Sequence, residues 1–188
     1  MAKKKSTSKS TSKPTPAKSA PSKQATSGPG SADRTHWLVK TEPESWSVDD
    51  FLKAPKKTTH WDGVRNYQAR NMLRDEMKLG HEVLVYHSNA EPPAIVGLAE
   101  VVREGYPDPS SWDKSSHYFD EGTSPDNVRW YMVDLRLKEK FAQPIPLPQL
   151  REDPQLDGME LLRKGSRLSV QSVSSAHFAH ILRLAGAT

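Results

Sequence analysis

The stretch from Trp61 to Asn71, WDGVRNYQARN, is the most informative segment of this chain of 188 residues. It holds two aromatic rings, two arginines and two asparagines, but only two aliphatic side chains. Aromatic rings can stack on bases, amides can read a hydrogen-bonding edge, and guanidinium groups can contact phosphates. The stretch therefore indicates a binding surface held against a structured domain.

The same stretch continues into a predicted helix over residues 66–77. One buried helical face is indicated by the i, i+3, i+4, i+8 spacing of Ala69, Met72, Leu73 and Met77. Other short helices are expected at 47–52, where Ser47 and Asp50 form a capping pattern, and after Ser174.

Around this helix the sequence predicts a mixed α+β domain. Apolar, β-branched and alternating stretches predict strands at 36–40, 83–87, 94–103, 129–141 and 169–173. Residues 105–127 are rich in Pro, Ser, Asp and aromatics, and an irregular segment of this length is commonly functional. The order of elements lacks the regular alternation of a doubly wound fold, so a small mixed or mostly antiparallel barrel with flanking helices fits better.

The first 33 residues differ in composition from the rest. They contain seven lysines, a single acidic residue (Asp33) and no Val, Leu, Ile, Phe, Trp or Tyr. Such a segment buries too little apolar area to offset its chain entropy, so we expect a disordered Lys/Ser/Pro-rich tail at 1–33 and a folded domain at 34–186.

The charge is unevenly distributed between tail and domain. The whole chain carries a net charge of +4, but after residue 33 only 20 basic residues face 22 acidic ones. The tail should attract polyanions in a salt-dependent way. The domain, in contrast, needs a local basic patch to bind nucleic acid.

The composition also excludes several classes of protein. There is no cysteine, which excludes disulfides and thiolate chemistry. No run of 18 apolar residues and no secretory h-region occur, so we expect a soluble, intracellular monomer without a membrane partner. It would be cytoplasmic in a bacterium or nuclear in a eukaryote.

Several segments together resemble the EVE domain family. These are residues 37–44, 61–71, 86–89 with 96–97, 101–109 and 167–171. The resemblance covers about residues 36–184, nearly the whole expected domain. It implies a PUA-like pseudobarrel, mixed and mostly antiparallel, which is related to YTH domains and accepts a modified base in a cleft. Thr41 stands where most members carry serine, and it keeps the hydroxyl group.

The expected cleft combines two strand ends with the opening stretch. A modified base must leave its stack and lie between flat or apolar walls. Trp61 and Tyr67 are the candidate walls, although core packing is the alternative for Trp61, and Asn66 is a candidate for reading the base edge. The candidate cleft residues are Lys40, Thr41, Glu42, Trp61, Val64, Asn66, Tyr67, His87, Ser88 and Asn89.

Other residues have two competing interpretations. Lys40 could meet a phosphate and Glu42 an exocyclic amine, or the two could form an exposed ion pair. The segment His87 to Asn89 could read a ligand or form a plain turn. The candidate phosphate contacts are Arg65, Arg70 and Arg129, and the aromatics that would form a flap over the cleft, or pin the long loop, are Trp112, Tyr118 and Phe119.

These features predict a non-enzymatic nucleic-acid reader of a modified base, most simply a modified cytosine such as 5-methylcytosine in DNA, with no cofactor or metal. An RNA reader is one alternative. Another is a nuclease or base-processing hydrolase that uses Lys40 and the nearby carboxylates. Catalytic patterns are weak, because His177 and His180 lack a third metal ligand. The carboxylates that could hold Mg²⁺ resemble ordinary first-turn acids; they are Glu42, Glu44, Asp49 and Asp50.

Overall fold

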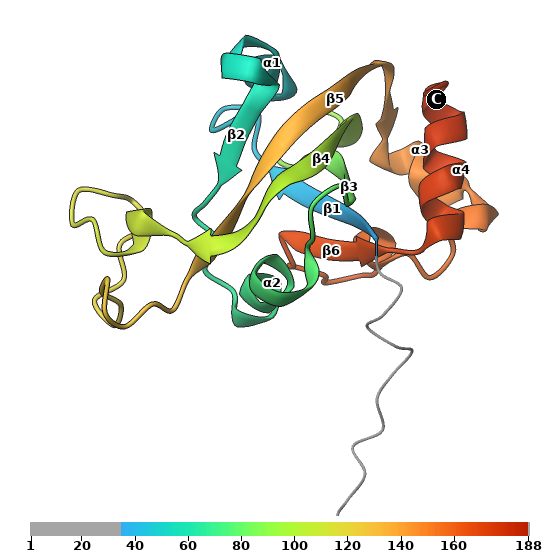
Figure 1. Ribbon diagram of the computed structural model, residues 1–188. Coiled ribbons are helices and arrows are strands. Elements are labelled where there is room, and N and C mark those ends of the chain that lie inside the picture. The colour runs from blue at the N-terminus through green and yellow to red at the C-terminus, as the bar shows by residue number, and fades with distance from the viewer. Residues whose placement is uncertain (1–34, 188) are drawn as a thin grey trace, which may run out of the picture. The chain divides into compact units, whose positions relative to one another are not determined.

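A computed structural model of the chain describes residues 35–187, so the tail predicted at 1–33 lies outside the described residues. The described residues form a six-stranded sheet with the order β2-β5-β4-β3-β1-β6 (Figure 1). The strands are β1 (His36–Thr41), β2 (Thr58–Trp61), β3 (Glu82–His87), β4 (Ala94–Pro107), β5 (Tyr131–Pro146) and β6 (Val170–Val173).

Within this sheet β1 and β3 pair in parallel, and the other neighbouring strands pair antiparallel. The predicted α+β class with a mixed, mostly antiparallel sheet is therefore confirmed. The pseudobarrel is not closed, because β2 and β6 form two separate edges.

Helices cover both faces of the sheet, which explains the nearly continuous apolar stretches of its central strands. Trp37 and Val39 face one core, which includes residues of α1 (Val48–Lys53) and α2 (Tyr67–Asn71). Leu38 faces the other core, which includes residues of α3 (Leu147–Glu152) and α4 (Ser175–Ala185). Because side chains alternate along a strand, Lys40 follows Leu38 on the α3 side, at the end of β1.

The helix predicted at 66–77 forms as two consecutive pieces. Asn66 caps α2, and a π-helical turn (Met72–Glu76) follows, closed by a 2.9 Å hydrogen bond from the Met77 N–H to the Met72 carbonyl. The predicted apolar face is confirmed, since Ala69, Met72, Leu73 and Met77 are all buried.

Three features differ from the sequence-based expectations. The short edge strand β2 was not predicted, β4 continues to Pro107, and β5 starts at Tyr131 and runs on to Pro146. Residues 108–130 then form a loop that extends away from the sheet between β4 and β5 (Figure 1). Among the described residues, no helix is long and apolar enough to span a membrane.

Candidate functional site

The parallel strands β1 and β3 end side by side and bring two predicted polar segments together. Lys40 pairs in register with Tyr86, and Thr41 pairs with His87. Beyond the pairing, the N–H and the hydroxyl of Ser88 both donate to the Thr41 carbonyl, at 2.9 and 3.2 Å. Two segments far apart in sequence thus form one continuous edge.

A cavity of about 590 Å³ opens at this edge, between the strand ends, α3 and residues 161–166. Tyr86, Ser88 and Ser166 are among its lining residues, and leucines complete its walls. Among the described residues that line it there is no carboxylate but there are four basic side chains, which are Lys40, Arg151, Arg163 and Lys164.

Lys40 is the most informative of these cations. Its side chain is partly buried, and burial lowers its pKa, while the nearby Glu160 carboxylate acts in the opposite direction. Within residues 35–187, the Lys40 ammonium makes no hydrogen bond or ion pair. Partial burial of this charge costs free energy that Glu160 offsets only in part, and an anion bound in the cavity would relieve the remainder.

A second, smaller cavity of about 270 Å³ adjoins the first. Gln68 and Met72, from α2 and the following turn, form part of its wall. The two cavities share Arg163, Gly165 and Ser166 as lining residues. We call the pair of cavities the strand-end groove.

A chain of hydrogen bonds holds the segment between the two cavities. The Ser166 hydroxyl donates to Glu160 Oε1 at 2.8 Å, and Gln171 Nε2 donates to Ser166 Oγ at 3.2 Å and to the Leu168 carbonyl at 3.1 Å. Because a backbone carbonyl only accepts, the Leu168 contact fixes the orientation of the buried Gln171 amide. The wall of the groove is therefore held in place before any ligand arrives.

Trp61 and Val64 lie in the core rather than in the groove. The Trp61 side chain is 8% exposed and stacks on Phe51, with ring centroids 6.2 Å apart and an interplanar angle of 17°. Val64 is 5% exposed and belongs to the same apolar cluster. Trp61 ends β2 opposite Val133 of β5, which turns its ring inward. This corrects the assignment of both residues to the cleft, and for Trp61 the structure shows the alternative of core packing.

Asn66 and Tyr67 begin α2 and have different environments. Asn66 Oδ1 accepts a hydrogen bond from the Ala69 N–H at 3.0 Å, so the amide oxygen expected to read a base serves as a helix cap. Tyr67 is 56% exposed and stacks on Trp130, with ring centroids 4.9 Å apart. Trp130 was not identified from the sequence.

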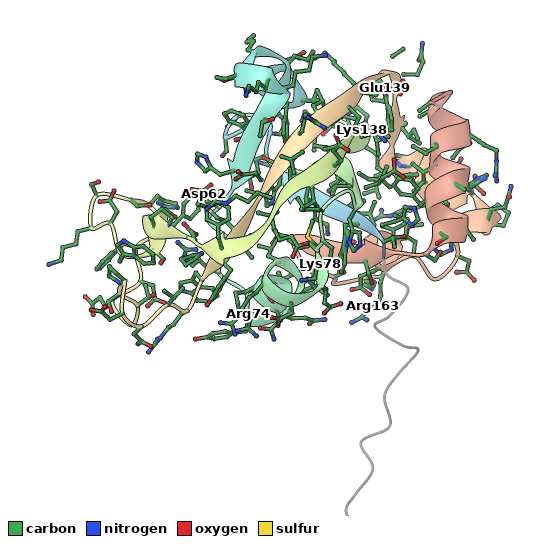
Figure 2. The ribbon with its side chains drawn as sticks, viewed as in Figure 1. Asp62, Arg74, Lys78, Lys138, Glu139 and Arg163 are labelled. Carbon is green, nitrogen blue, oxygen red and sulfur yellow. The ribbon has the colours of Figure 1, made fainter. Side chains whose placement is uncertain are left out.

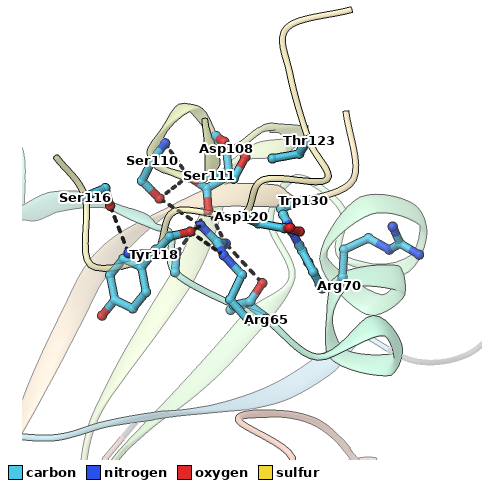
Figure 3. Close-up of polar contacts among 12 residues, drawn as sticks. Arg65, Arg70, Asp108, Ser110, Ser111, Ser116, Tyr118, Asp120, Thr123 and Trp130 are labelled. Carbon is cyan, nitrogen blue, oxygen red and sulfur yellow. Dashed lines mark hydrogen bonds and ion pairs between the residues drawn. The ribbon is translucent and has the colours of Figure 1, made fainter. Parts of the chain in front are cut away.

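Arg65 is engaged within the protein (Figure 3). Its Nη1 lies 2.8 Å from Asp108 Oδ2, and Nε and Nη2 both donate to the Tyr118 carbonyl, at 2.8 and 2.6 Å. Asp108 has no exposed surface and also accepts from the Gly63 N–H at 3.1 Å. This corrects the assignment of Arg65 to phosphate binding, because its donors already anchor the loop 108–130.

The other two candidate phosphate contacts keep free donors. Arg70 Nη1 donates to the Arg129 carbonyl and Nε donates to Asn71 Oδ1, which leaves Nη2 available. The Arg129 guanidinium has no hydrogen bond or ion pair among the described residues, and it packs so closely over Gly122 that a Cβ there would lie 2.0 Å from Nη1. Phosphate binding by these two residues stays a prediction.

The remaining strand-end residues have mainly structural contacts. His87 Nε2 accepts from the Val48 N–H at 3.1 Å, and burial lowers the pKa of His87, which favours the neutral imidazole that this bond requires. The Thr41 hydroxyl donates to the Trp46 carbonyl at 2.9 Å. Glu42 is exposed, and Asn89 is an exposed residue with a φ of 51°, the conformation of a turn.

Tyr118 pins the long loop to the body of the domain. A Cβ added to Gly63 would lie 2.6 Å from the Tyr118 ring, so the ring packs directly on that glycine. Gly63 has a φ of +71°, which also favours glycine. Tyr118 therefore attaches the loop to the domain and does not form a flap over the cleft.

Three of the groups considered for catalysis, which are Asp49, Asp50 and His180, have local partners. Asp50 accepts from the N–H and hydroxyl of Ser47, and Asp49 contacts Lys140 at 2.6 Å. His180 Nε2 lies 2.6 Å from Asp153 Oδ2. Asp50 therefore serves as part of a helix cap, Asp49 forms a surface ion pair, and His180 is the partner of Asp153.

The open, mostly antiparallel sheet with a basic groove at its parallel strand ends agrees with the PUA-like binding domain that the resemblance implies. The family model described as the EVE domain matches residues 35–184, and the chain belongs to this family.

Relatives of known name and structure support this assignment. Human thymocyte nuclear protein 1 is 41% identical, over 80% of this chain and 73% of that protein. A hypothetical protein from Leishmania major has a similar structure, with a TM-score of 0.77, 43% identity and coverage of 84% of this chain and 98% of that chain. The crystal structure of human THYN1 in complex with DNA containing 5-methylcytosine has a TM-score of 0.75 and 39% identity, covering 81% of this chain and 98% of that chain.

Proposed function

We propose that this protein is a non-enzymatic reader that binds DNA carrying a modified cytosine and receives the modified base in the strand-end groove. The observation that carries the proposal is the similarity, over 81% of the chain, to human THYN1 in complex with 5-methylcytosine-containing DNA. The groove supplies the local basic patch that a domain with more acids than bases needs.

The charge distribution supports binding of a nucleotide at this groove. Among the described residues, Lys40 places a partly buried ammonium, which makes no direct ion pair, in a cavity whose lining has no carboxylate. The smaller cavity offers polar groups from Gln68, Glu160 and Ser166. A nucleotide therefore finds cations for its phosphate in the larger cavity and hydrogen-bonding groups for a base edge in the smaller one.

Recognition of the modification itself would depend on a small apolar contact. A base must leave the duplex stack to enter such a groove, which costs a few kcal/mol. Burial of one additional methyl group contributes only about 0.8 kcal/mol. Most of the affinity therefore comes from the phosphate and hydrogen-bonding contacts, and the methyl group adds a modest preference.

Capture from native nucleic acid tests the polymer that is bound. We expect the protein to retain DNA enriched in modified cytosine when it is offered sheared genomic DNA and total RNA together, with nucleosides quantified by mass spectrometry. Enrichment of modified nucleosides from RNA alone would support the RNA reader instead. A labelled oligonucleotide incubated with the protein, with and without Mg²⁺, should be recovered intact, whereas a metal- or pH-dependent product would support the hydrolase.

A further inference from the structure

The Tyr67 ring forms an exposed, supported stacking surface outside the groove. One face of the ring lies against Trp130, at 4.9 Å between centroids and 25° between planes. Tyr67 is 56% exposed, whereas Trp130 is 5% exposed. Most of the exposed surface of this aromatic pair therefore belongs to Tyr67.

Arg70 does not cover the outer face of the exposed Tyr67 ring. The Arg70 guanidinium carbon lies 5.0 Å from the Tyr67 ring centroid and 6.0 Å from that of Trp130. A guanidinium on the outer face of Tyr67 would lie about twice as far from Trp130 as from Tyr67. Arg70 instead lies beside the stacked pair, where it adds positive charge without covering the outer ring face.

Trp130, on which the Tyr67 ring stacks, is held in place by contacts of its own. Trp130 Nε1 donates to Asp120 Oδ2 at 2.6 Å, and the Arg65 guanidinium lies 5.4 Å from the Trp130 ring (Figure 3). Arg65 is itself fixed by the buried Asp108. A base that stacks on Tyr67 therefore meets a ring that is already ordered, which lowers the entropic cost of binding.

Tyr67 is next in sequence to a residue of the groove, and cations lie on the same part of the domain. Tyr67 directly precedes Gln68, which lines the smaller cavity, and neighbouring Cα atoms are about 3.8 Å apart. Arg70 retains its free Nη2, and its Nη1 donates to the Arg129 carbonyl, which places the two arginines next to each other. Arg74 lies on the turn that follows α2, and Arg163 lines the groove (Figure 2).

We propose that the outer face of Tyr67 stacks on the unpaired or destacked nucleobase next to the one in the groove. The proposal rests on the proposed function, because it requires a nucleotide in the groove. Aromatic rings stack on any base, so this surface would increase affinity without distinguishing the modification. Arg70 and Arg129 would then lie beside the phosphates of the same strand segment.

The test uses oligonucleotides with 2-aminopurine beside a single 5-methylcytosine or cytosine. This analogue brightens when it loses its stacking neighbours. We expect dim 2-aminopurine in saturated complexes of the wild type and of Tyr67→Phe, and bright 2-aminopurine with Tyr67→Leu and Tyr67→Ala. Affinity should fall about fivefold to hundredfold in Tyr67→Ala, on both oligonucleotides, so that the ratio of the two affinities is unchanged.

The control variant is Leu79→Ala, which also removes an exposed large side chain, 61% exposed, and lines none of the cavities described above. It should bind like the wild type. Tyr67→Leu keeps an apolar side chain against Trp130, so it separates loss of the aromatic face from loss of support for the loop.

Two results would overturn the proposal. The first is that Tyr67→Leu and Tyr67→Ala bind with wild-type affinity and leave 2-aminopurine dim, which would exclude a stacking role for Tyr67. The second is that these variants lose the preference for 5-methylcytosine, which would place Tyr67 at the modified base itself. Failure of the wild type to bind either oligonucleotide would instead refute the proposed function. The two failures are therefore distinguishable.

Discussion

Replacing Arg65 by alanine should destabilise the protein by about 3–5 kcal/mol, the range expected when one partner of a buried ion pair is removed. The substitution leaves the Asp108 carboxylate, which has no exposed surface, without its 2.8 Å contact. It also removes both hydrogen bonds to the Tyr118 carbonyl. Urea unfolding, followed by fluorescence and by circular dichroism, measures the change in the free energy of unfolding.

The matched control is Arg74→Ala, which removes an arginine from an exposed contact with Asp75. Exposed pairs contribute at most about 1 kcal/mol, so this variant should unfold close to the wild type. Similar unfolding free energies for Arg65→Ala and Arg74→Ala would contradict a structural role for Arg65.

The Arg65–Asp108 ion pair also predicts how the difference in unfolding free energy between the wild type and Arg65→Ala depends on pH. Burial alone would raise the pKa of Asp108, but hydrogen bonds from Ser110, Arg65 and Gly63 outweigh it and lower that pKa. A carboxylate with a lowered pKa contributes stability that is present above its unfolded value, near 4, and is lost as the pH falls through its folded value. The difference in unfolding free energy between the wild type and Arg65→Ala should therefore become smaller below about pH 4.

The second large effect is expected on binding. Replacing Lys40 by methionine should weaken oligonucleotide binding about tenfold to hundredfold, because a hydrogen bond to a charged group contributes roughly 1.5–3 kcal/mol. Losing one phosphate contact should also reduce the slope of log affinity against log salt by about 0.9. Fluorescence anisotropy at several salt concentrations measures both quantities.

Stability provides an independent check on Lys40. The ammonium is partly buried and makes no hydrogen bond or ion pair among residues 35–187, so Lys40→Met should unfold at the same or a higher temperature than the wild type. The charge-matched control is Lys138→Met, which removes an exposed partner of Glu82 and lines none of the cavities described above. Equal binding by Lys40→Met and the wild type would exclude Lys40 from the interface.

Much of the fold was accessible from the sequence because it depends on local patterns. The strands β1, β3, β4 and β5 contain long apolar or alternating stretches, and the helical segment from Ala69 to Met77 buries the face that its spacing indicated. The edge strand β2 contains only TTHW, which is too short for a periodic signal. It becomes a strand because it pairs with β5, and this pairing turns Trp61 into the core.

The candidate site was predicted less completely, because its parts come together through distant contacts. Lys40 and Ser88 were identified because both follow apolar strands, and the parallel pairing of β1 and β3 brings them to one cavity. Arg151 and Arg163 were not identified from the sequence, because they lie in segments without periodic patterning. The nearby motif 167–171 resembled the family but did not point to these two arginines. In the fold, Trp61 stacks on Phe51 and Arg65 pairs with Asp108. Neither partner could be inferred from the polar residues next to Trp61 and Arg65 in sequence.

The most direct test of the proposed reader function is a titration of the wild type against two duplexes that differ only by one 5-methyl group on cytosine. At equal salt concentration, we expect the modified duplex to bind about fourfold more tightly, which corresponds to burial of one methyl group at about 0.8 kcal/mol. Indistinguishable affinities for the two duplexes would contradict recognition of the modified base in the groove.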